Sequence, residues 1–385
     1  MEQIFSFFST ESWILAGGVF LFFLIQLCYS FGVSSRVAFY KLKKHSLSSE
    51  KPAVSIILSA KNEHEVLQYT LPKILSQNYP EYEVVVINDC SEDDSEMLLA
   101  TLKGKYPHLV TRNIIKDEVF SHSKKLALGV GIKAAKHDIC LFIDADCYPA
   151  SDQWLSNMQQ FFTPKTEVVL GYTRIDPAKN ARWIRADRLM QSLHFLGKAL
   201  AHRPYIGQGS NMAYRKSLFF KNKGFDMRIT KGLREDYIFI NQVVTRTNTS
   251  VSVMPEATTI SSLRVSPSRW WMQRCEELRS LSLCERCSRY PAFLESILRL
   301  IYYAFVIAAL LHFAPQREIL YSLLAIELLR NLGLSIVFTK SARKLGEKGI
   351  LFPLLCWNFI YPFVHLVLVL TANSFSKDRR MRQRR

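Results

Sequence analysis

The stretch Asp138-Ile-Cys-Leu-Phe-Ile-Asp-Ala-Asp146 decides the fold that the sequence predicts. Its apolar run, 139–143, is flanked by charged residues, which is typical of a central parallel strand covered on both faces. Ligands of open α/β sheets bind beyond the carboxyl ends of the strands. Asp144 and Asp146 therefore stand where a ligand would lie.

The spacing of Asp144 and Asp146 also indicates a chemistry. Residues i and i+2 of an extended chain project to the same side, so both carboxylates can converge on one hard cation such as Mg²⁺. Mg²⁺ typically takes one or two protein carboxylates and fills its other positions with water and substrate phosphate. The alternative is a solvated turn after a strand, because Asp is a common turn residue.

The segments before this stretch predict alternating strands and helices. Strands are expected at 54–59, 83–89 and near 110–115, and helices at 64–77, from Ser91 to about 103, and at 126–135. This order is typical of βαβ units in a parallel sheet. The first two strands deliver Glu63 and Asp89 to the carboxyl edge of that sheet.

Later segments continue the domain. A helix at 154–162 and a strand at 167–172 precede a glycine-containing loop at 207–211. Glu235 and Asp236 stand just before an apolar helix at 237–244, either as functional carboxylates or as an ordinary helix-start pair that complements the dipole. The sequence contains no Walker-type loop and no Gly-x-Gly-x-x-Gly after a strand.

Long uncharged runs predict membrane segments. The run 13–33 exceeds the ~20 residues that span a bilayer, and it lacks the basic start and cleavage site of a signal peptide. Uncharged runs recur at 300–316 and 349–376, with a weaker apolar segment at 319–339 between them. Glu327 and Arg330 in that segment would each cost ~2.5 to 3.5 kcal/mol at mid-bilayer unless paired or buried.

The placement of the charges, with a net charge of +17, favours a membrane surface over nucleic acid as the partner. Basic residues cluster beside the hydrophobic runs, as cytoplasmic flanks and anionic-lipid contacts do. They are Arg36, Lys41, Lys43, Lys44, Lys340, Arg343, Lys344, Lys348, Lys377, Arg379, Arg380, Arg382, Arg384 and Arg385. The soluble middle of the chain is therefore expected in the cytoplasm.

Two membrane topologies are considered, and they differ in whether every basic cluster stays on the cytoplasmic side. In the first, 297–315 and 319–339 cross the bilayer and 350–372, which contains Pro353 and Pro362, is re-entrant or lies in the plane of the membrane. In the second, 319–339 does not cross, but the basic loop 340–348 is exported. The first is preferred.

Taken in order, these pieces resemble the family 2 glycosyltransferases of GT-A fold in their membrane-anchored bacterial form. The matching stretches are 54–63, Ile87-Asn-Asp-Cys-Ser-Glu-Asp-Asp94, Ser123-Lys-Lys-Leu-Ala-Leu128, Phe142-Ile-Asp-Ala-Asp-Cys147, 207–215 and Arg234-Glu-Asp236. The resemblance implies an α/β fold with a Rossmann-like, mostly parallel sheet and membrane helices at both ends. It implies transfer of a sugar from a nucleotide-diphosphate donor, a UDP-sugar by preference.

The resemblance also implies roles for individual residues. Glu63 and Asp89 match positions that hold the uracil and ribose of the donor, and Lys125 matches a basic position after the third strand. Asp144 matches the first Asp of the DxD motif, near ribose and metal, and Asp146 the second, a direct ligand of Mg²⁺ or Mn²⁺.

The family's acidic general base corresponds to Asp236, with Glu235 beside it. Processive synthases of the family carry Gln-x-x-Arg-Trp on a later interfacial helix. Here Gln273-Arg-Cys-Glu-Glu277 departs from that motif, which leaves Gln273 and Arg274 as candidate phosphate or acceptor contacts. The departure favours transfer of one or a few sugars to a lipid-linked or cell-envelope glycan. A catalytically silent membrane assembly subunit and a processive polysaccharide synthase are the alternatives.

The resulting organisation has five parts. We expect a membrane anchor and basic linker at 1–51, a GT-A domain at 52–263, an amphipathic interfacial region at 264–295, membrane segments at 296–376 and a basic cytoplasmic tail at 377–385. The expected location is the bacterial inner membrane, with several crossings and the catalytic domain in the cytoplasm.

Overall fold

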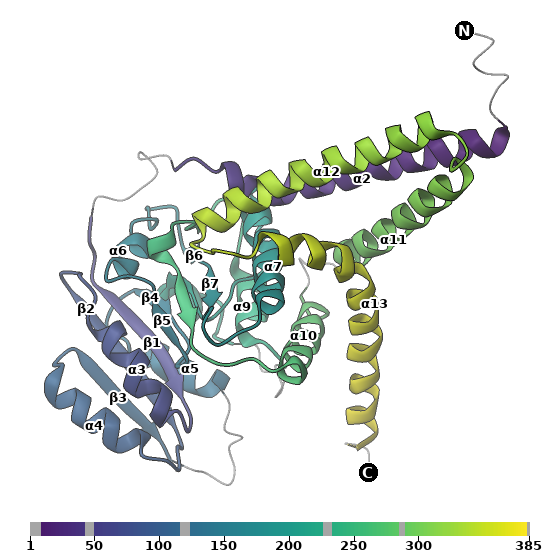
Figure 1. Ribbon diagram of the computed structural model, residues 1–385. Helices are drawn as coiled ribbons and strands as arrows, with labels where there is room; N and C mark the ends of the chain where they lie inside the picture. The colour runs from purple at the N-terminus through teal and green to yellow at the C-terminus, as the bar shows by residue number, and fades with distance from the viewer. Residues whose placement is uncertain (1–8, 43–49, 116–123, 226–232, 285–288, 383–385) are drawn as a thin grey trace.

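A seven-stranded, mostly parallel sheet forms the centre of the soluble part (Figure 1). The computed structural model describes residues 9–42, 50–115, 124–225, 233–284 and 289–382. In spatial order the strands are β3 (Leu109–Ile114), β2 (Tyr82–Asp89), β1 (Val54–Ala60), β4 (Ile139–Phe142), β8 (Met212–Arg215), β6 (Val168–Leu170) and β9 (Thr249–Val251). The first four are parallel, and β8 is antiparallel to both of its neighbours. The predicted α/β class is confirmed.

Alternating residues of the strands build a core on each face of the sheet. Ile56 and Leu58 of β1 pack with α3 (His64–Leu75), α4 (Ser95–Lys105) and α6 (Trp154–Gln159). Ile57 points to the opposite core, which contains residues of α5 (Lys124–Ala134), α7 (Arg182–Leu200), α8 (Lys216–Lys221) and α9 (Glu235–Val243). Burial on both faces explains why these strands are continuous apolar runs in the sequence.

A second, three-stranded sheet follows the Asp-Ala-Asp stretch directly. Its order is β5 (Cys147–Pro149), β10 (Thr259–Ser261) and β7 (Thr173–Ile175), and the short 3₁₀ helix η2 (Pro255–Ala257) precedes β10. β10 pairs with β5 in antiparallel register, with Ser261 opposite Cys147. This pairing fixes the backbone immediately after Asp146.

Four helices in the described part of the chain are long and apolar enough to cross a membrane. They are α2 (Thr10–Phe39), α11 (Arg289–His312), α12 (Arg317–Lys344) and α13 (Leu351–Arg382). The two ionic residues in the middle of α12 are paired with each other, because Arg330 Nη1 lies 3.2 Å from Glu327 Oε2. Tyr302 of α11 donates a further hydrogen bond to Glu327. Pairing of this kind lowers the cost of placing charge in a bilayer.

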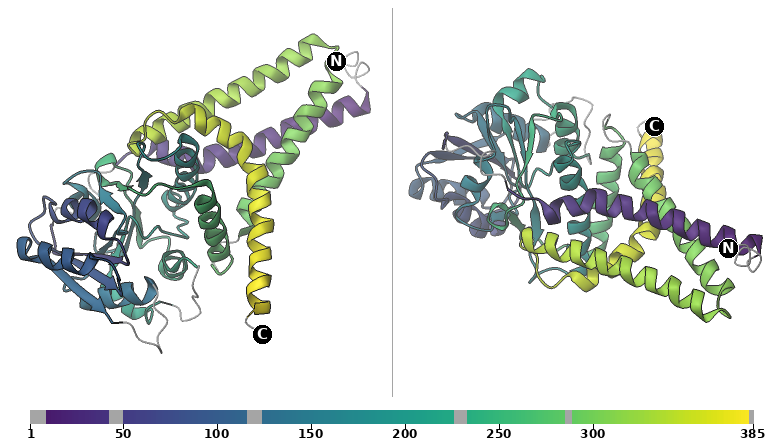
Figure 2. Two further views of the ribbon diagram at one scale, coloured as in Figure 1. Left: turned by 60° about the horizontal axis from the view of Figure 1, so that its bottom comes forward. Right: turned by 90° about the horizontal axis from the view of Figure 1, so that it is seen from above.

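The helices differ in direction (Figures 1 and 2). α2 and α12 run side by side away from the soluble part, and α11 joins them at their far end. α13 bends, and its second half runs at a steep angle to α2, beside the amphipathic helix α10 (Pro267–Leu281). Pro362 lies inside α13, and a proline within a helix removes a backbone hydrogen bond and kinks the axis.

A buried ion pair joins the soluble part to the membrane helices. Arg185 of α7 lies 2.5 Å from Glu347, which stands between α12 and α13. The Tyr172 hydroxyl donates a hydrogen bond of 3.0 Å to the same carboxylate. Two residues further along α7, Asp187 accepts hydrogen bonds from the indoles of Trp270 in α10 and Trp357 in α13. These contacts fix α10 and α13 against α7.

Candidate active site

The carboxylates predicted from the strands gather at one edge of the sheet. β1, β2 and β4 are parallel neighbours, so their carboxyl ends lie together. Glu63 follows β1, Asp89 ends β2 and Asp144 follows β4. Burial raises the pKa of Glu63, and the negative charge of Asp146 raises it further. Glu63 thus follows a strand whose carboxyl end lies beside those that carry Asp89 and Asp144.

Asp144 and Asp146 form the part of the site best suited to a cation. One ligand atom from each, with the Cys147 sulfur, lies within 4.8 Å of the others. Burial raises the pKa of the Cys147 thiol, which keeps it protonated and so favours the two carboxylates as ligands. Carboxylate oxygens are the ligands that Mg²⁺ and Mn²⁺ prefer, so the residues present fit such an ion.

Asp146 is held by the second sheet. Ser261 donates a hydrogen bond of 2.8 Å to Asp146 Oδ2, and both the amide and the hydroxyl of Ser262 donate to its backbone carbonyl at 2.8 Å. Burial raises the pKa of Asp146, and the neighbouring charge of Asp144 adds to that rise. A cation bound between the two carboxylates would offset both effects.

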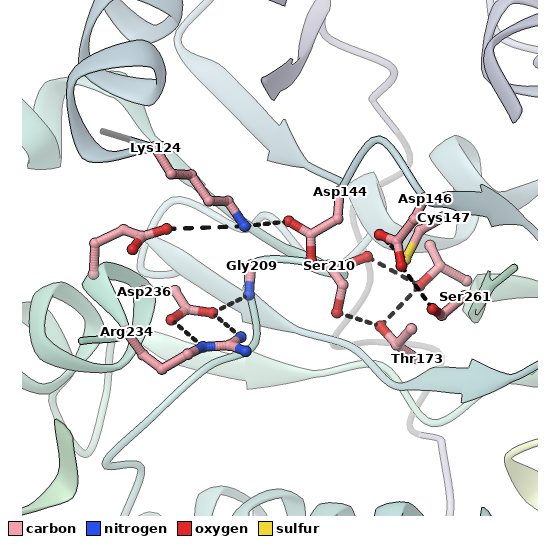
Figure 3. Close-up of polar contacts among 12 residues, drawn as sticks. Lys124, Asp144, Asp146, Cys147, Thr173, Gly209, Ser210, Arg234, Asp236 and Ser261 are labelled. Carbon is pink, nitrogen blue, oxygen red and sulfur yellow. Dashed lines mark hydrogen bonds and ion pairs between the residues drawn. The ribbon is translucent and has the colours of Figure 1, made fainter. Parts of the chain in front are cut away.

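A lysine occupies the centre of the cluster (Figure 3). Lys124 Nζ lies 2.5 Å from Asp144 Oδ1 and 3.9 Å from Glu235 Oε1. Burial alone would lower the pKa of Lys124, but the charges of Asp144 and Glu235 outweigh burial and raise it. The ammonium group is thus a fixed positive charge between two carboxylate groups that would otherwise repel each other.

This lysine is adjacent to the one that the sequence prediction favours. Lys125 was expected at the site, whereas the ion pairs with Asp144 and Glu235 belong to Lys124. Both begin α5, and successive helical residues point in directions about 100° apart. The helix phase, which composition leaves open at a first turn, brings Lys124 to these carboxylates, and the role of Lys125 stays a prediction.

Asp236 is buried and fully hydrogen-bonded. Its Oδ2 accepts from the Gly209 amide and from Arg234 Nη2, both at 2.7 Å. Its Oδ1 accepts from Arg234 Nε at 3.1 Å and from the Tyr237 amide at 2.9 Å. A carboxylate offers about four acceptor positions, so these donors use its whole capacity.

Of the two glycines in the loop at 207–211, Gly209 lies against Asp236. A Cβ atom at Gly209 would lie 3.2 Å from Asp236 Oδ2, closer than nearly all such contacts. The loop is fixed from below by Ser210, whose hydroxyl lies 2.8 Å from the Thr173 hydroxyl (Figure 3). The backbone of this loop therefore approaches the Asp236 carboxylate closely.

The pKa values of the adjacent carboxylates Glu235 and Asp236 are shifted in opposite directions. Burial would raise the pKa of Asp236, but the Arg234 guanidinium outweighs burial and lowers it. Burial raises the pKa of Glu235, and the charge of Lys124 only partly opposes this rise. At neutral pH, Asp236 is ionised, and Glu235 is the carboxylate whose protonation is the easier of the two.

Arg274 faces two carboxylates in the fold, and its predicted role as a phosphate or acceptor contact stays a prediction. Its guanidinium was a candidate phosphate or acceptor contact, but it is buried in α10 and hydrogen-bonded to Glu277, with Asp187 3.8 Å away. The two carboxylates neutralise the charge that a phosphate would need. Gln273 is half-buried on the same helix, and its role stays a prediction.

Comparison with known proteins identifies the class of the domain. Residues 55–221 match the model of the family described as Glycosyl transferase family 2. The matched range contains the strands β1 to β8, except for the first residue of β1, and the Asp-Ala-Asp stretch. The chain therefore carries a family 2 glycosyltransferase domain.

Curated relatives extend the comparison. The poly-beta-1,6-N-acetyl-D-glucosamine synthase of Staphylococcus epidermidis is 28% identical over 156 residues, which are 40% of this chain and 37% of that protein. The enzyme of the same name from Staphylococcus aureus strain COL is 28% identical over 170 residues, 44% of this chain and 37% of that protein. The matched segment thus spans little more than a third of each relative.

A solved structure resembles most of the chain. It is the mannosyltransferase PcManGT from Pyrobaculum calidifontis in complex with GDP-Man and Mn²⁺, with a TM-score of 0.53 and 16% identity. The alignment covers 90% of this chain and 97% of the other. At this identity the likeness concerns the fold, and it supports the GT-A assignment.

Proposed function

We propose that the protein is an inverting glycosyltransferase that moves a sugar from a nucleotide-diphosphate donor to a lipid-linked or cell-envelope glycan acceptor. This proposal rests on the position of Lys124, which is paired with Asp144 and also faces Glu235. Glu235 is the chain neighbour of Asp236. One cluster thus combines a candidate metal site with candidate bases. A silent assembly subunit would have no use for this set of buried carboxylates.

In this proposal the donor lies along the carboxyl edge of the sheet. Glu63 and Asp89 hold the uracil and ribose, and Asp144 and Asp146 are the residues that would hold Mg²⁺ or Mn²⁺. Such an ion would supply positive charge to stabilise a departing phosphate. Lys124 adds a protein cation at the same place, which supports the departure of the nucleotide.

We assign the general base to Asp236. It removes the proton of the acceptor hydroxyl while that oxygen attacks the anomeric carbon, and such proton transfer typically contributes ~10²- to 10⁴-fold. Because four donors already occupy its oxygens, Asp236 must give up one of them to accept the hydroxyl. Arg234 is the donor with a flexible side chain and is the one that can move.

Glu235 is the second candidate for the base. Its raised pKa is closer to neutral, where general bases work best, and its nearest ion-pair partner, Lys124, is 3.9 Å away. In either case a single displacement with the base opposite the leaving group inverts the anomeric centre.

The membrane arrangement proposed with this function has three crossings. α2 and α12 run side by side and α11 meets them at their far end, whereas the second half of α13 turns to lie beside the amphipathic α10 (Figure 1). This supports the topology in which 350–372 is re-entrant or lies in the plane of the membrane. The catalytic domain and the basic tail then share the cytoplasmic side of a bacterial inner membrane.

The test is transfer by the detergent-purified full chain with a panel of nucleotide sugars. UDP-N-acetylglucosamine comes first because of the named relatives, and GDP-mannose is included because of the solved structure. We expect release of one nucleotide and, from an α-linked donor, a β-linked product. Product length separates transfer of a few sugars from polymer synthesis. Failure to bind or turn over any donor would favour the assembly-subunit alternative.

A further inference from the structure

A groove of about 360 Å³ lies beside the C-terminal end of α2, where this helix meets the last turn of α7. Its walls carry three aromatic side chains, Phe31, Phe39 and Tyr40, together with Arg36 and Leu200. None of the carboxylates of the candidate active site lines this α2 groove. Its size falls within the ~300 to 1,000 Å³ of small-molecule sites in proteins.

The α2 groove lies at the depth of lipid headgroups. α2 has 30 residues and is therefore about 45 Å long, whereas the hydrocarbon core of a bilayer is ~30 Å thick. The chain carries no charge from Ser12 to Ser35, and Arg36 is the first charged residue after that run. The last turns of α2 therefore extend beyond the hydrocarbon, to the level of the phosphate groups.

Two lysines of α12 reach the same place. Lys344 donates a hydrogen bond to the backbone carbonyl of Tyr40, and Lys340 Nζ lies 4.4 Å from the centre of the Phe39 ring. Both aromatic residues line the α2 groove. α2 and α12 run side by side to this end (Figures 1 and 2). Tyr40 and Lys344 are 304 positions apart in the chain, so the fold gathers two separate basic clusters at one groove.

The cations at the α2 groove lack a counter-charge. Within the described residues, Arg36, Lys340 and Lys344 form no ion pair with a carboxylate. The acidic residue nearest to them in the sequence, Glu347, is already paired with Arg185. Lys340 and Lys344 are four residues apart on one helix, a spacing at which like charges repel each other. An anion at the groove would relieve this repulsion.

The shape and the aromatic walls select a lipid as the source of that anion. Phe39 is 52% exposed although it is a large apolar side chain, and Phe31 continues the apolar wall toward the hydrocarbon. A free phosphate ion would leave the Phe39 ring in water, whereas an acyl chain would cover it. Basic pockets between membrane helices on the cytoplasmic side suit anionic headgroups.

We propose that the α2 groove binds one anionic phospholipid, with its headgroup phosphate at Arg36 and Lys340. An acyl chain of this lipid lies against Phe31 and Phe39. The lipid thus bridges α2, α12 and the end of α7, where the catalytic domain joins the membrane helices. This inference goes beyond the proposed transferase and does not depend on it.

The test measures lipid retained by the full chain from nanodiscs that contain equal amounts of phosphatidylglycerol and phosphatidylcholine. Native mass spectrometry counts the bound lipids, and we expect wild type to retain phosphatidylglycerol. Arg36→Gln and Lys340→Gln each remove one cation, so each should weaken this retention about fivefold. Arg317→Gln removes the same charge at the opposite end of α12 and is the matched control. It should retain phosphatidylglycerol as wild type does.

A second pair of variants tests the shape of the groove without changing charge. A Cβ atom at Gly32, which lines the groove, meets no atom within 4 Å, so Gly32→Phe can fill the groove. We expect it to weaken phosphatidylglycerol retention about tenfold or more. Gly17→Phe is the matched control, because Gly17 also lies on α2 with open space around it but outside the groove lining.

Thermal unfolding first establishes that each variant is folded. Equal retention of the two lipids by wild type would overturn the proposal, as would equal phosphatidylglycerol retention by wild type, Arg36→Gln and Gly32→Phe. Displacement of the bound lipid by inorganic phosphate would show a site for a free anion and overturn the assignment to a lipid. Groove-dependent lipid retention without any donor turnover would support this inference and count only against the transferase.

Discussion

Lys124 Nζ lies 2.5 Å from Asp144 Oδ1, so a protein cation already occupies one oxygen of the candidate metal site. The same ammonium lies 3.9 Å from Glu235 and joins the two groups of carboxylates. Because the ammonium and a divalent metal would compete for Asp144, this contact governs how the site responds to metal and to donor.

Replacing Lys124 with Met tests this competition. Without the ammonium, Asp144 is free for the metal, so we expect Mn²⁺ to bind about tenfold more tightly in the absence of donor. Nucleotide release should fall, because the cation that supports the leaving phosphate is lost. Calorimetry of Mn²⁺ binding measures the first effect. Lys125→Met is the matched control, and an equal change in both variants would contradict the role of Lys124.

Replacing the base gives a second prediction. Asp236→Asn keeps the shape of the side chain but loses the ability to accept a proton, so we expect transfer to fall ~10²- to 10⁴-fold with donor binding retained. Glu235→Gln should reduce transfer less. Rates and donor affinities of both variants decide the assignment. Near-normal transfer by Asp236→Asn with loss in Glu235→Gln would move the role to Glu235.

The pH profile tests the pairing of Arg234 with Asp236. A base must be ionised, and its activity is lost as the pH falls through its pKa. Arg234 lowers the pKa of Asp236, so Arg234→Met should raise that pKa and move the acid limb of kcat/KM to higher pH, by about one to three units. Arg234→Lys should restore part of the wild-type limb. An unmoved acid limb in Arg234→Met would show that Asp236 does not control it.

The junction between the domain and the membrane helices is expected to stabilise the protein. The side chains of Arg185 and Glu347 are 7% and 2% exposed. Removing one partner leaves a buried charge, so Arg185→Met should reduce the free energy of unfolding by about 3 to 5 kcal/mol. Asp138→Asn breaks the exposed pair with Arg215 and should cost about 1 kcal/mol or less. Equal thermal stability of the two variants would contradict this account.

The sequence predicts the βαβ half of the domain well, because its strands are buried on both faces and end in carboxylates. β1, β2 and β4 begin and end within one or two residues of the predicted strands. The short strands β7, β9 and β10 were not predicted. Each has three residues, too few for a periodic pattern.

α7 was also not predicted, for a different physical reason. Its buried positions include Arg185 and Asp187, which break the apolar periodicity that marks a helix. These residues are satisfied by Glu347 and by Trp270, which lie about 80 or more positions away in the chain. Only the tertiary fold brings such partners together.

The candidate site also has a part that the sequence predicts and a part that it leaves open. The predicted roles of Asp144, Asp146 and Asp236 rest on residues that the fold gathers, and these roles stay predictions until they are tested. The position of Lys124 and the burial of Arg274 depend on helix phase and on distant partners, which local patterns leave open.

The most direct test of the transferase account compares metal-dependent nucleotide release by wild type, Asp146→Asn and Asp138→Asn. Asp146 is the proposed metal ligand, whereas Asp138 precedes the same strand at its opposite end. We predict that wild type and Asp138→Asn release nucleotide with Mn²⁺ and stop with chelator, and that Asp146→Asn releases little in either condition. Equal, metal-dependent release by Asp146→Asn would contradict the proposed site.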